Sequence, residues 1–448
     1  MNGSRPEQLV HPDWIWAAGR LQRGVAIGIR GGRIASVAPP SGPSTLRLSG
    51  KALIPGFVSA HSHAFQRGLR GTTERFATAT PGAAASSKAN FFTWRDSMYG
   101  LVDALTAESC YQLSKQCFLE MIAAGITSVG EFHYARHLTQ AGSEARDEER
   151  YVFDGAVLAA ARDAGIRIVL LHACYMQGGF DAPLAGGQLR FRTRDERDYW
   201  DRFDALAAAC DSATQSVGAT AHSVRAVPIE SIERLHAESI RRGVVFHMHL
   251  EEVRKEISDC IAAHGKRPAQ LLLDRLAIDA RFTAVHCTHT SAEDLGRLAA
   301  TGATMCLCPL TEGNLGDGIC NVAAIRAASG AIAFGSDLNS RLAPTEELRW
   351  IEYVQRVRHE ERGVVTDASG DAGAALLDIG TLNGARSLGL EAGSIAVGQF
   401  ADFAIVDLNH LTMSGWTPES FAAHLVFGTG TSAVCGTCVG GHWKIRRA

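Results

Sequence analysis

The chain has 448 residues, of which 46% are hydrophobic, 20% charged and 7% aromatic, and its formal net charge is -3. This length and apolar content exclude a disordered chain and allow two or three domains, or one large barrel with a small companion domain. The balance of 44 Lys and Arg against 47 Asp and Glu argues against a nucleic-acid-binding surface. The sequence also has no apolar run long enough to cross a membrane.

The first ten residues, MNGSRPEQLV, lack the apolar core of a signal peptide. Eleven cysteines, an odd number scattered along a long chain, are not typical of a disulfide framework. We therefore expect a soluble protein of the reducing cytoplasm that acts on a small molecule, with no nucleic-acid or membrane partner. A homodimer is the expected oligomer by default.

Short alternating segments at both ends of the chain predict β strands. Residues 25–40 form a hairpin pattern around a Gly-Gly turn, and residues 400–410 and 431–448 repeat the pattern. Neither end alone has enough strands for a stable sheet. We therefore expect residues 1–55 and 395–448 to form one small β-sandwich domain together.

Residues 56–394 form the expected barrel domain. The run that predicts its first strand begins three residues earlier, at residue 53. Short apolar runs alternate there with Ala- and Leu-rich helical segments such as 108–125 and 153–165. The eight runs lie at residues 53–61, 126–133, 166–172, 217–222, 244–250, 282–289, 302–309 and 331–337. Eight strands separated by helices predict an α/β fold, a parallel (β/α)8 TIM-like barrel. Residues 78–90, TATPGAAASSKAN, are predicted to form a loop that closes over the substrate.

Most of these runs end in His or Asp, and the active site of such a barrel lies at the C-terminal ends of its strands. His61 and His63 stand two positions apart at the end of the first run, so both side chains face one way. Two neighbouring imidazoles suit a metal such as zinc. The alternative is a pair of surface histidines on a loop.

The run VVFHMHLEE, residues 244–252, supplies a further metal-ligand candidate and a candidate acid–base group. His249 is favoured over His247 as a ligand because it lies nearer the end of the strand. Glu252 is expected in the loop above the metal, where a carboxylate can shuttle protons, while Glu251 points elsewhere. The alternative is the charged start of a helix.

The sixth and eighth runs add His286 and Asp337, with His289 as a structural partner. Three imidazoles and one carboxylate leave room for water, which is typical of an open catalytic metal site. The chain has no lysine between Lys115 and Lys255, so no lysine near the fourth strand can bridge two metals. We expect one divalent metal ion, zinc.

The order HxH, HxxE, His and Asp along eight βα units resembles the amidohydrolase superfamily, in its mononuclear deaminase branch. The longer motifs HSHAFQR, FFTWRD, EFHYARH, AHSVRA, HMHLEE, TEGNLGDGI and EELRWIEYVQR resemble formimidoylglutamate deiminases. Such enzymes hydrolyse N-formimino-L-glutamate to N-formyl-L-glutamate and ammonia in histidine degradation. The resemblance implies zinc bound by His61, His63, His249 and Asp337, and chemistry by Glu252, His286 and Asp337. It also implies substrate contacts from Gln66, Arg95, Tyr134, His222 and Arg225.

The two arginines suit this substrate independently of the resemblance, because a guanidinium binds a carboxylate with two hydrogen bonds and a glutamate moiety has two carboxylates. One residue departs from the family pattern. Asn339 stands where a histidine is expected after Ser336-Asp337, and an amide does not titrate near neutral pH.

Two alternatives stay open. The first is a mononuclear deaminase of an aromatic ring, such as a guanine-like or triazine substrate; the paired arginines argue against it. The second is a metal-binding barrel without catalysis, against which Glu252 argues because a structural zinc site needs no such carboxylate.

Overall fold

The computed structural model describes residues 7–40, 42–74, 90–140, 146 and 149–445. Eight parallel strands form the barrel sheet, in the order of the chain from the first to the last. They are β6 (Phe57–Ser62), β7 (Ile126–His133), β8 (Arg167–Cys174), β9 (Gln215–Ala221), β10 (Phe246–Leu250), β11 (Phe282–His286), β12 (Thr304–Leu307) and β13 (Ala331–Phe334). A parallel bridge between Ser62 and Asp337 brings the first and last strands together, so the barrel is nearly closed.

The predicted (β/α)8 barrel is confirmed, and every predicted run overlaps a barrel strand. The first run is divided, however, because residues up to Pro55 belong to β5 (Leu46–Pro55) of the other sheet. Gly56 stands at the break, where a Cβ would lie 2.1 Å from the Thr127 hydroxyl. Only glycine allows the chain to pass this close to the neighbouring strand.

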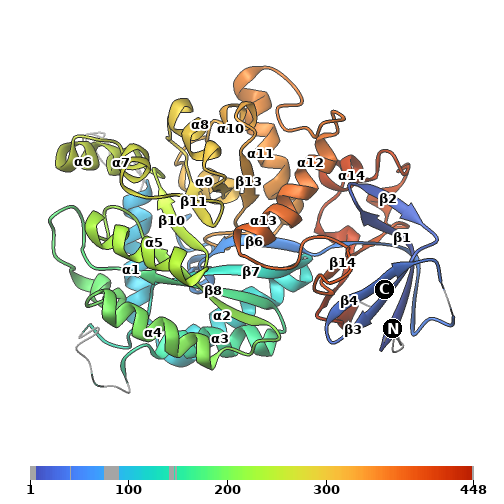
Figure 1. The fold of residues 1–448 in the computed structure, drawn as a ribbon, viewed down its shortest axis with the longest axis horizontal. Helices are drawn as coiled ribbons and strands as arrows, with labels where there is room; N and C mark the ends of the chain where they lie inside the picture. Colours follow the sequence, from blue (N-terminus) through green and yellow to red (C-terminus); the bar gives the residue numbers. More distant parts are fainter. Residues whose placement is uncertain (1–6, 41, 75–89, 141–145, 147–148, 446–448) are drawn as a thin grey trace.

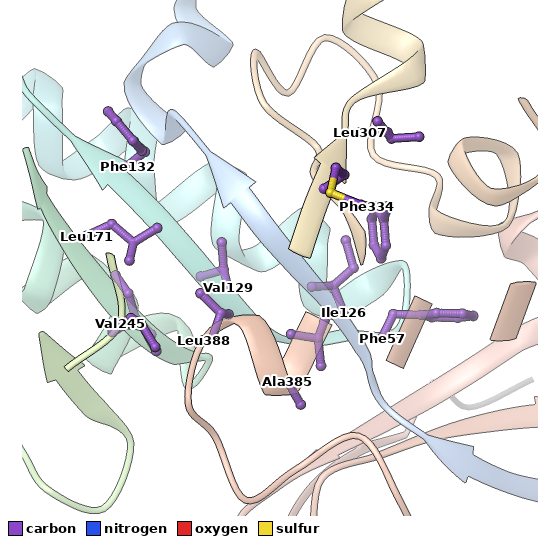
Figure 2. Packing of buried hydrophobic residues seen from close by; sticks show 14 of the residues in the cluster. Phe57, Ile126, Val129, Phe132, Leu171, Val245, Leu307, Phe334, Ala385 and Leu388 are labelled. Carbon is purple, nitrogen blue, oxygen red and sulfur yellow. The ribbon is translucent and has the colours of Figure 1, made fainter. Parts of the chain in front are cut away.

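The barrel strands are hydrophobic because both of their faces are covered. Every residue of β6, β7 and β8 is buried. Figure 2 shows part of this core, in which Phe57, Ile126 and Val129 come from the strands. The Leu388 side chain packs against the barrel at Gly130. A Cβ on residue 130 would lie only 2.5 Å from Leu388 Cδ2, so a glycine is needed for this contact.

Helices follow the strands around the barrel (Figure 1). The α helices are α1 (Phe91–Ala104), α2 (Ala107–Ala123), α3 (Val152–Ala164), α4 (Glu196–Ala209), α5 (Ile229–Arg242), α6 (Arg254–His264), α7 (Pro268–Arg275), α8 (Ala292–Ala300), α9 (Pro309–Leu315), α10 (Val322–Ala327), α11 (Pro344–His359), α12 (Ala372–Asp378), α13 (Gly384–Ser387) and α14 (Phe421–Ala423). The other helical segments are η1 (Ala64–Leu69), η4 (Gly186–Phe191), η5 (Ile379–Asn383), η6 (Leu411–Met413), η7 (His424–Gly428) and η8 (Thr431–Ala433). The two predicted helical segments correspond to α2 and α3. None of the described helices is long and apolar enough to cross a membrane.

Both chain ends contribute to a second sheet, as predicted, and Figure 1 shows them at the same side of the molecule. Its strands are β1 (Gln8–Ala17), β2 (Arg20–Arg23), β3 (Ala26–Arg30), β4 (Arg33–Ala38), β5, β14 (Phe403–Asp407), β15 (Val434–Val439) and β16 (His442–Ile445). The expected β-sandwich takes the form of one mixed sheet, in which β1 and β5 are parallel. The exact domain boundaries, residues 1–55 with 395–448 against 56–394, stay a prediction.

A buried ion pair joins the two sheets. Arg167 at the start of β8 donates from Nε and Nη2 to the two carboxylate oxygens of Asp402, at 2.7 and 3.1 Å. Asp402 also accepts the Gly440 N–H at 2.7 Å, so its carboxylate links strands of both domains. The predicted closing loop at residues 78–90 lies almost wholly outside the described residues, which omit 75–89.

Candidate active site

The hydrogen bonds that close the barrel hold three of the predicted metal ligands. The Asp337 N–H donates to the His61 carbonyl at 3.1 Å, and the His63 N–H donates to the Asp337 carbonyl at 2.8 Å. Gly335 allows this approach, because a Cβ there would lie 2.7 Å from the His61 Cβ. The contact between the first and last strands therefore sets the spacing of these side chains.

The four predicted metal ligands converge. His61 Nε2 lies 3.2 Å from the Nε2 atoms of both His63 and His249. The Asp337 Oδ1 atom lies 3.4 Å from Nε2 of His61 and from Nε2 of His63. Two groups of possible ligand atoms share His61. One group adds His63 and His249, and the other adds His286 and Asp337. Within each group the ligand atoms all lie within 4.8 Å of one another.

The remaining ring nitrogens show that this donor set fits a cation. Nδ1 of His63 lies 2.8 Å from the Phe132 carbonyl, and Nδ1 of His249 lies 2.9 Å from the His222 carbonyl. A carbonyl only accepts, so each Nδ1 carries the hydrogen and each Nε2 carries a lone pair. The Nε2 lone pairs of His63 and His249 both face His61 Nε2. Because that nitrogen carries at most one hydrogen, at least one lone pair has no hydrogen to accept. A metal ion among the three would satisfy all of them.

The protonation states also suit metal binding. Burial and the neighbouring His61 lower the pKa of His63 to about 3. Burial and the other histidines likewise place the pKa of His249 well below its usual value. Burial alone would raise the pKa of Asp337, but its hydrogen bond with His61 and the nearby histidines lower it. Neutral imidazoles and an ionised carboxylate are the forms that bind a metal.

Glu252 and His286 lie beside this cluster. The His286 Nε2 atom is 3.6 Å from Glu252 Oε1 and 3.8 Å from Asp337 Oδ2, and its Nδ1 atom is 3.5 Å from Glu312 Oε1. Burial alone would lower the pKa of His286, but Glu252 and the other two carboxylates raise it well above its usual value. Burial raises the pKa of Glu252. The pair can therefore hold and pass protons.

The backbone at these strand ends is strained. His286 has a φ of 71°, Asp337 of 44° and Glu251 of 50°, all in the left-handed region that non-glycine residues avoid. Such conformations cluster at functional sites, where the surrounding structure imposes them. Glu251 turns away from the pocket and binds Arg267 Nη2 at 3.0 Å and the Ala269 N–H at 3.2 Å.

A pocket opens onto the cluster. His63, His249, Glu252, His286 and Asp337 line it. All five predicted substrate-contact residues line it as well, namely Gln66, Arg95, Tyr134, His222 and Arg225. Aromatic rings form much of the remaining wall, from Phe91, Trp94, Tyr99, Tyr175 and Phe191. The structure thus brings every predicted site residue to one place. Of these residues only His61 does not line the pocket, and it is fully buried beside His63 and His249.

Two guanidinium groups bring positive charge into the pocket. Arg225 follows β9, and its Nε atom lies 3.9 Å from Glu256 Oε1, too far for a hydrogen bond. Arg95 of α1 lies over the rings of Phe92 and Tyr99, at 5.0 and 5.6 Å from their centroids. Among the described residues Arg95 has no ion pair, so both arginines keep N–H donors for an anionic ligand.

Sequence reasoning missed Glu312 and did not anticipate the role of Asn339. Glu312 lies in α9, directly after the seventh barrel strand, and the C-terminal end of that strand was the available signal. Asn339 is fully buried and does not line the pocket. Its amide donates to Ser62 Oγ (3.1 Å) and the Asp337 carbonyl (2.8 Å) and accepts from Ser336 Oγ (2.8 Å). It therefore supports the turn that carries Asp337.

Comparison with known proteins agrees with this geometry. The amidohydrolase family model matches residues 52–444. The chain belongs to the amidohydrolase family. Its similarity to a Pseudomonas aeruginosa formimidoylglutamate deiminase is 34% identity over 417 residues, covering 93% of this chain and 89% of the relative. A 5-methylthioadenosine/S-adenosylhomocysteine deaminase of Natronomonas pharaonis is 26% identical over 409 residues, 90% of this chain and 83% of the relative. The predicted family and a hydrolase acting on C–N bonds are both confirmed.

Solved structures share the fold along nearly the whole chain. An amidohydrolase from Brucella melitensis has a TM-score of 0.87 and 31% identity, covering 98% of this chain and 95% of that one. An adenosine deaminase from Xanthomonas campestris with bound zinc has a TM-score of 0.79 and 23% identity, covering 99% and 94%. At that identity the second comparison supports the fold alone.

Proposed function

We propose that this amidohydrolase converts N-formimino-L-glutamate and water to N-formyl-L-glutamate and ammonia. The observation that carries the proposal is the pairing of Arg95 and Arg225 in one pocket with the histidine and aspartate cluster. A dicarboxylate substrate gives each guanidinium an anionic partner. The 34% identical relative named a formimidoylglutamate deiminase supports the same substrate.

His61, His63, His249 and Asp337 would hold one zinc ion. When bound there, zinc supplies a nucleophile at neutral pH because it lowers the pKa of water from about 15.7 to about 7. We expect a single ion because no lysine near the fourth barrel strand could bridge a second one. The residue that follows this strand is His222, and the sequence around it has no lysine.

The carboxylates and His286 would move the protons. Asp337 or Glu252 accepts a proton from the attacking water as its oxygen bonds to the formimino carbon. Glu252 then delivers this proton and the hydroxyl proton of the tetrahedral adduct to the departing nitrogen, so that the C–N bond breaks, the formyl C=O forms and ammonia leaves. His286, kept protonated by the carboxylates around it, donates a hydrogen bond to the oxygen bonded to the attacked carbon, where negative charge develops.

The rest of the substrate would lie along the other predicted contacts. Arg95 and Arg225 would bind the two carboxylates, and Gln66, Tyr134 and His222 line the same pocket. Gln66 Nε2 and the Tyr134 hydroxyl are 2.6 Å apart, so these two side chains act as one hydrogen-bonded unit toward the formimino group.

The aromatic wall favours a second candidate function, deamination of a flat ring. Relatives that include methylthioadenosine deaminases have such substrates by name. A neutral ring, however, would leave both arginines in the pocket without an anionic partner. A barrel that only binds metal is a weaker candidate still, because it would have no use for Glu252 beside His286.

Ammonia release from N-formimino-L-glutamate, guanine and 5-methylthioadenosine, measured with purified protein and its metal content, tests these functions. We expect release from the formimino substrate alone and one zinc per chain. Release from a ring substrate alone would replace the proposal with the second candidate, and no release with full zinc content would favour the third.

A further inference from the structure

Tyr99 and Tyr175 line the pocket and have no part in the function proposed above. Tyr99 belongs to α1, and Tyr175 follows β8 directly with an exposed fraction of 3%. The Tyr175 ring packs against Phe191 and His222, with centroids 5.3 and 4.7 Å apart, and Tyr99 packs against the same Phe191 at 6.3 Å. Neighbouring rings therefore fix the positions of both phenols.

One side-chain amide lies beside both hydroxyl groups. Gln188 Nε2 is 3.1 Å from the Tyr99 hydroxyl, and 3.4 Å from both the Tyr175 hydroxyl and the Gly178 carbonyl. Gln188 Oε1 accepts the backbone N–H of Ala185 at 3.1 Å. A backbone N–H only donates, so this contact decides which end of the amide is the oxygen. The amide nitrogen is therefore the donor, and its two hydrogens are shared among the two phenol oxygens and the Gly178 carbonyl.

Each phenol thus accepts a hydrogen bond and keeps its own hydrogen for another partner. In the part of the chain that the structure describes, neither hydroxyl has a hydrogen-bond acceptor for that hydrogen. Burial raises the pKa of Tyr175 well above its usual value, even though Arg225 and Arg95 act to lower it, so the hydroxyl remains a donor at neutral pH. Together with the two guanidinium groups, these two O–H donors form a group of hydrogen-bond donors that is suited to bind an anion.

We propose that the Tyr99 and Tyr175 hydroxyls donate hydrogen bonds to a substrate carboxylate beside Arg95 and Arg225. Gln188 is the positioning residue that keeps both hydroxyls as donors. This inference rests on the proposed function, and it adds the residues that make the pocket selective for a dicarboxylate. Hydrogen bonds to a charged acceptor are about twice as strong as those between neutral groups, so the contribution is measurable.

Tyr99→Phe and Tyr175→Phe test the donors, because each removes one O–H and keeps the ring. We expect each change to raise KM for N-formimino-L-glutamate about ten-fold and to weaken binding of the product N-formyl-L-glutamate by the same factor, with kcat within two-fold. Zinc content and the circular dichroism spectrum should not change. Tyr111→Phe is the matched control, since the Tyr111 hydroxyl donates to Asp163 at 2.7 Å outside the pocket.

Gln188→Glu tests the positioning role with a side chain of the same size. A carboxylate accepts only, so it would draw both hydroxyl hydrogens away from the substrate. KM should rise as in the phenylalanine variants, and adding Tyr99→Phe and Tyr175→Phe to Gln188→Glu should raise it no further. A further rise in the triple variant would overturn the positioning role.

The outcomes separate this inference from the function on which it rests. If the unsubstituted enzyme releases ammonia from N-formimino-L-glutamate and both phenylalanine variants keep its KM and product affinity, the tyrosine subsite is overturned and the proposed function stands. If the unsubstituted enzyme neither turns over this substrate nor binds its product in calorimetry, both are overturned.

Discussion

Replacing Glu252 with glutamine should separate proton transfer from metal binding. The Glu252 carboxylate lies 3.6 Å from His286 Nε2, yet it is not part of either cluster of converging ligand atoms. Glutamine has nearly the same shape but cannot deliver a proton. The change should therefore stop the chemistry and leave the four metal ligands in place.

The magnitude follows from the proton delivery to the departing nitrogen, which glutamine cannot perform. A positioned general acid or base contributes about 10²–10⁴-fold to the rate, which is about 2.7–5.5 kcal/mol of barrier. Asp337 lies 3.8 Å from the same His286 nitrogen and remains to accept the proton of water. We therefore expect kcat to fall by about 10²–10⁴, with KM changed little because the arginines still bind the carboxylates.

Ammonia release by purified protein, with zinc measured per chain, is the assay. Glu352→Gln is a matched control, because Glu352 of α11 is also buried but lies outside the pocket and accepts the N–H groups of Gly363 and Val365 at 2.9 and 2.8 Å. It should lower Tm and keep kcat. Retention of more than a tenth of kcat by Glu252→Gln would refute the proton-transfer role, and loss of zinc would make Glu252 a ligand.

Three further predictions concern substrate binding, the turn at Asp337 and acid stability. Arg225→Ala should raise KM for the dicarboxylate by ten-fold or more with a smaller change in kcat, and an unchanged KM in steady-state kinetics removes Arg225 from the binding site. Asn339→Ala removes the hydrogen bonds that hold the Asp337 turn and should cost about 1–3 kcal/mol of unfolding free energy, so an unaltered urea midpoint would contradict this role. Burial lowers the pKa of His236 in α5 to about 4, against about 6.5 when unfolded. Its contribution to stability is therefore complete above pH 6.5 and is lost as the pH falls toward 4. His236→Leu should reduce the loss of unfolding free energy between pH 8 and pH 5 by about 2 kcal/mol, and equal losses in both proteins would exclude this effect.

The sequence by itself determined the barrel and most of the candidate site. Alternation of short apolar runs with helical segments predicts parallel strands, because only strands covered on both faces are apolar along their length. His61, His63, His249 and Asp337 each stand at the end of such a run. Since the C-terminal ends of barrel strands share one face, their order along the chain was enough to predict that they meet.

Only the tertiary structure decided how the surrounding groups pair. Glu312 beside His286 could not be assigned from the sequence, because the contact joins the loops of two different strands. The same holds for Gln188, whose amide reaches Tyr99 from 89 residues away in the chain. A strand end restricts a side chain to one face of the barrel, but its hydrogen-bond partner depends on how loops distant in sequence pack together.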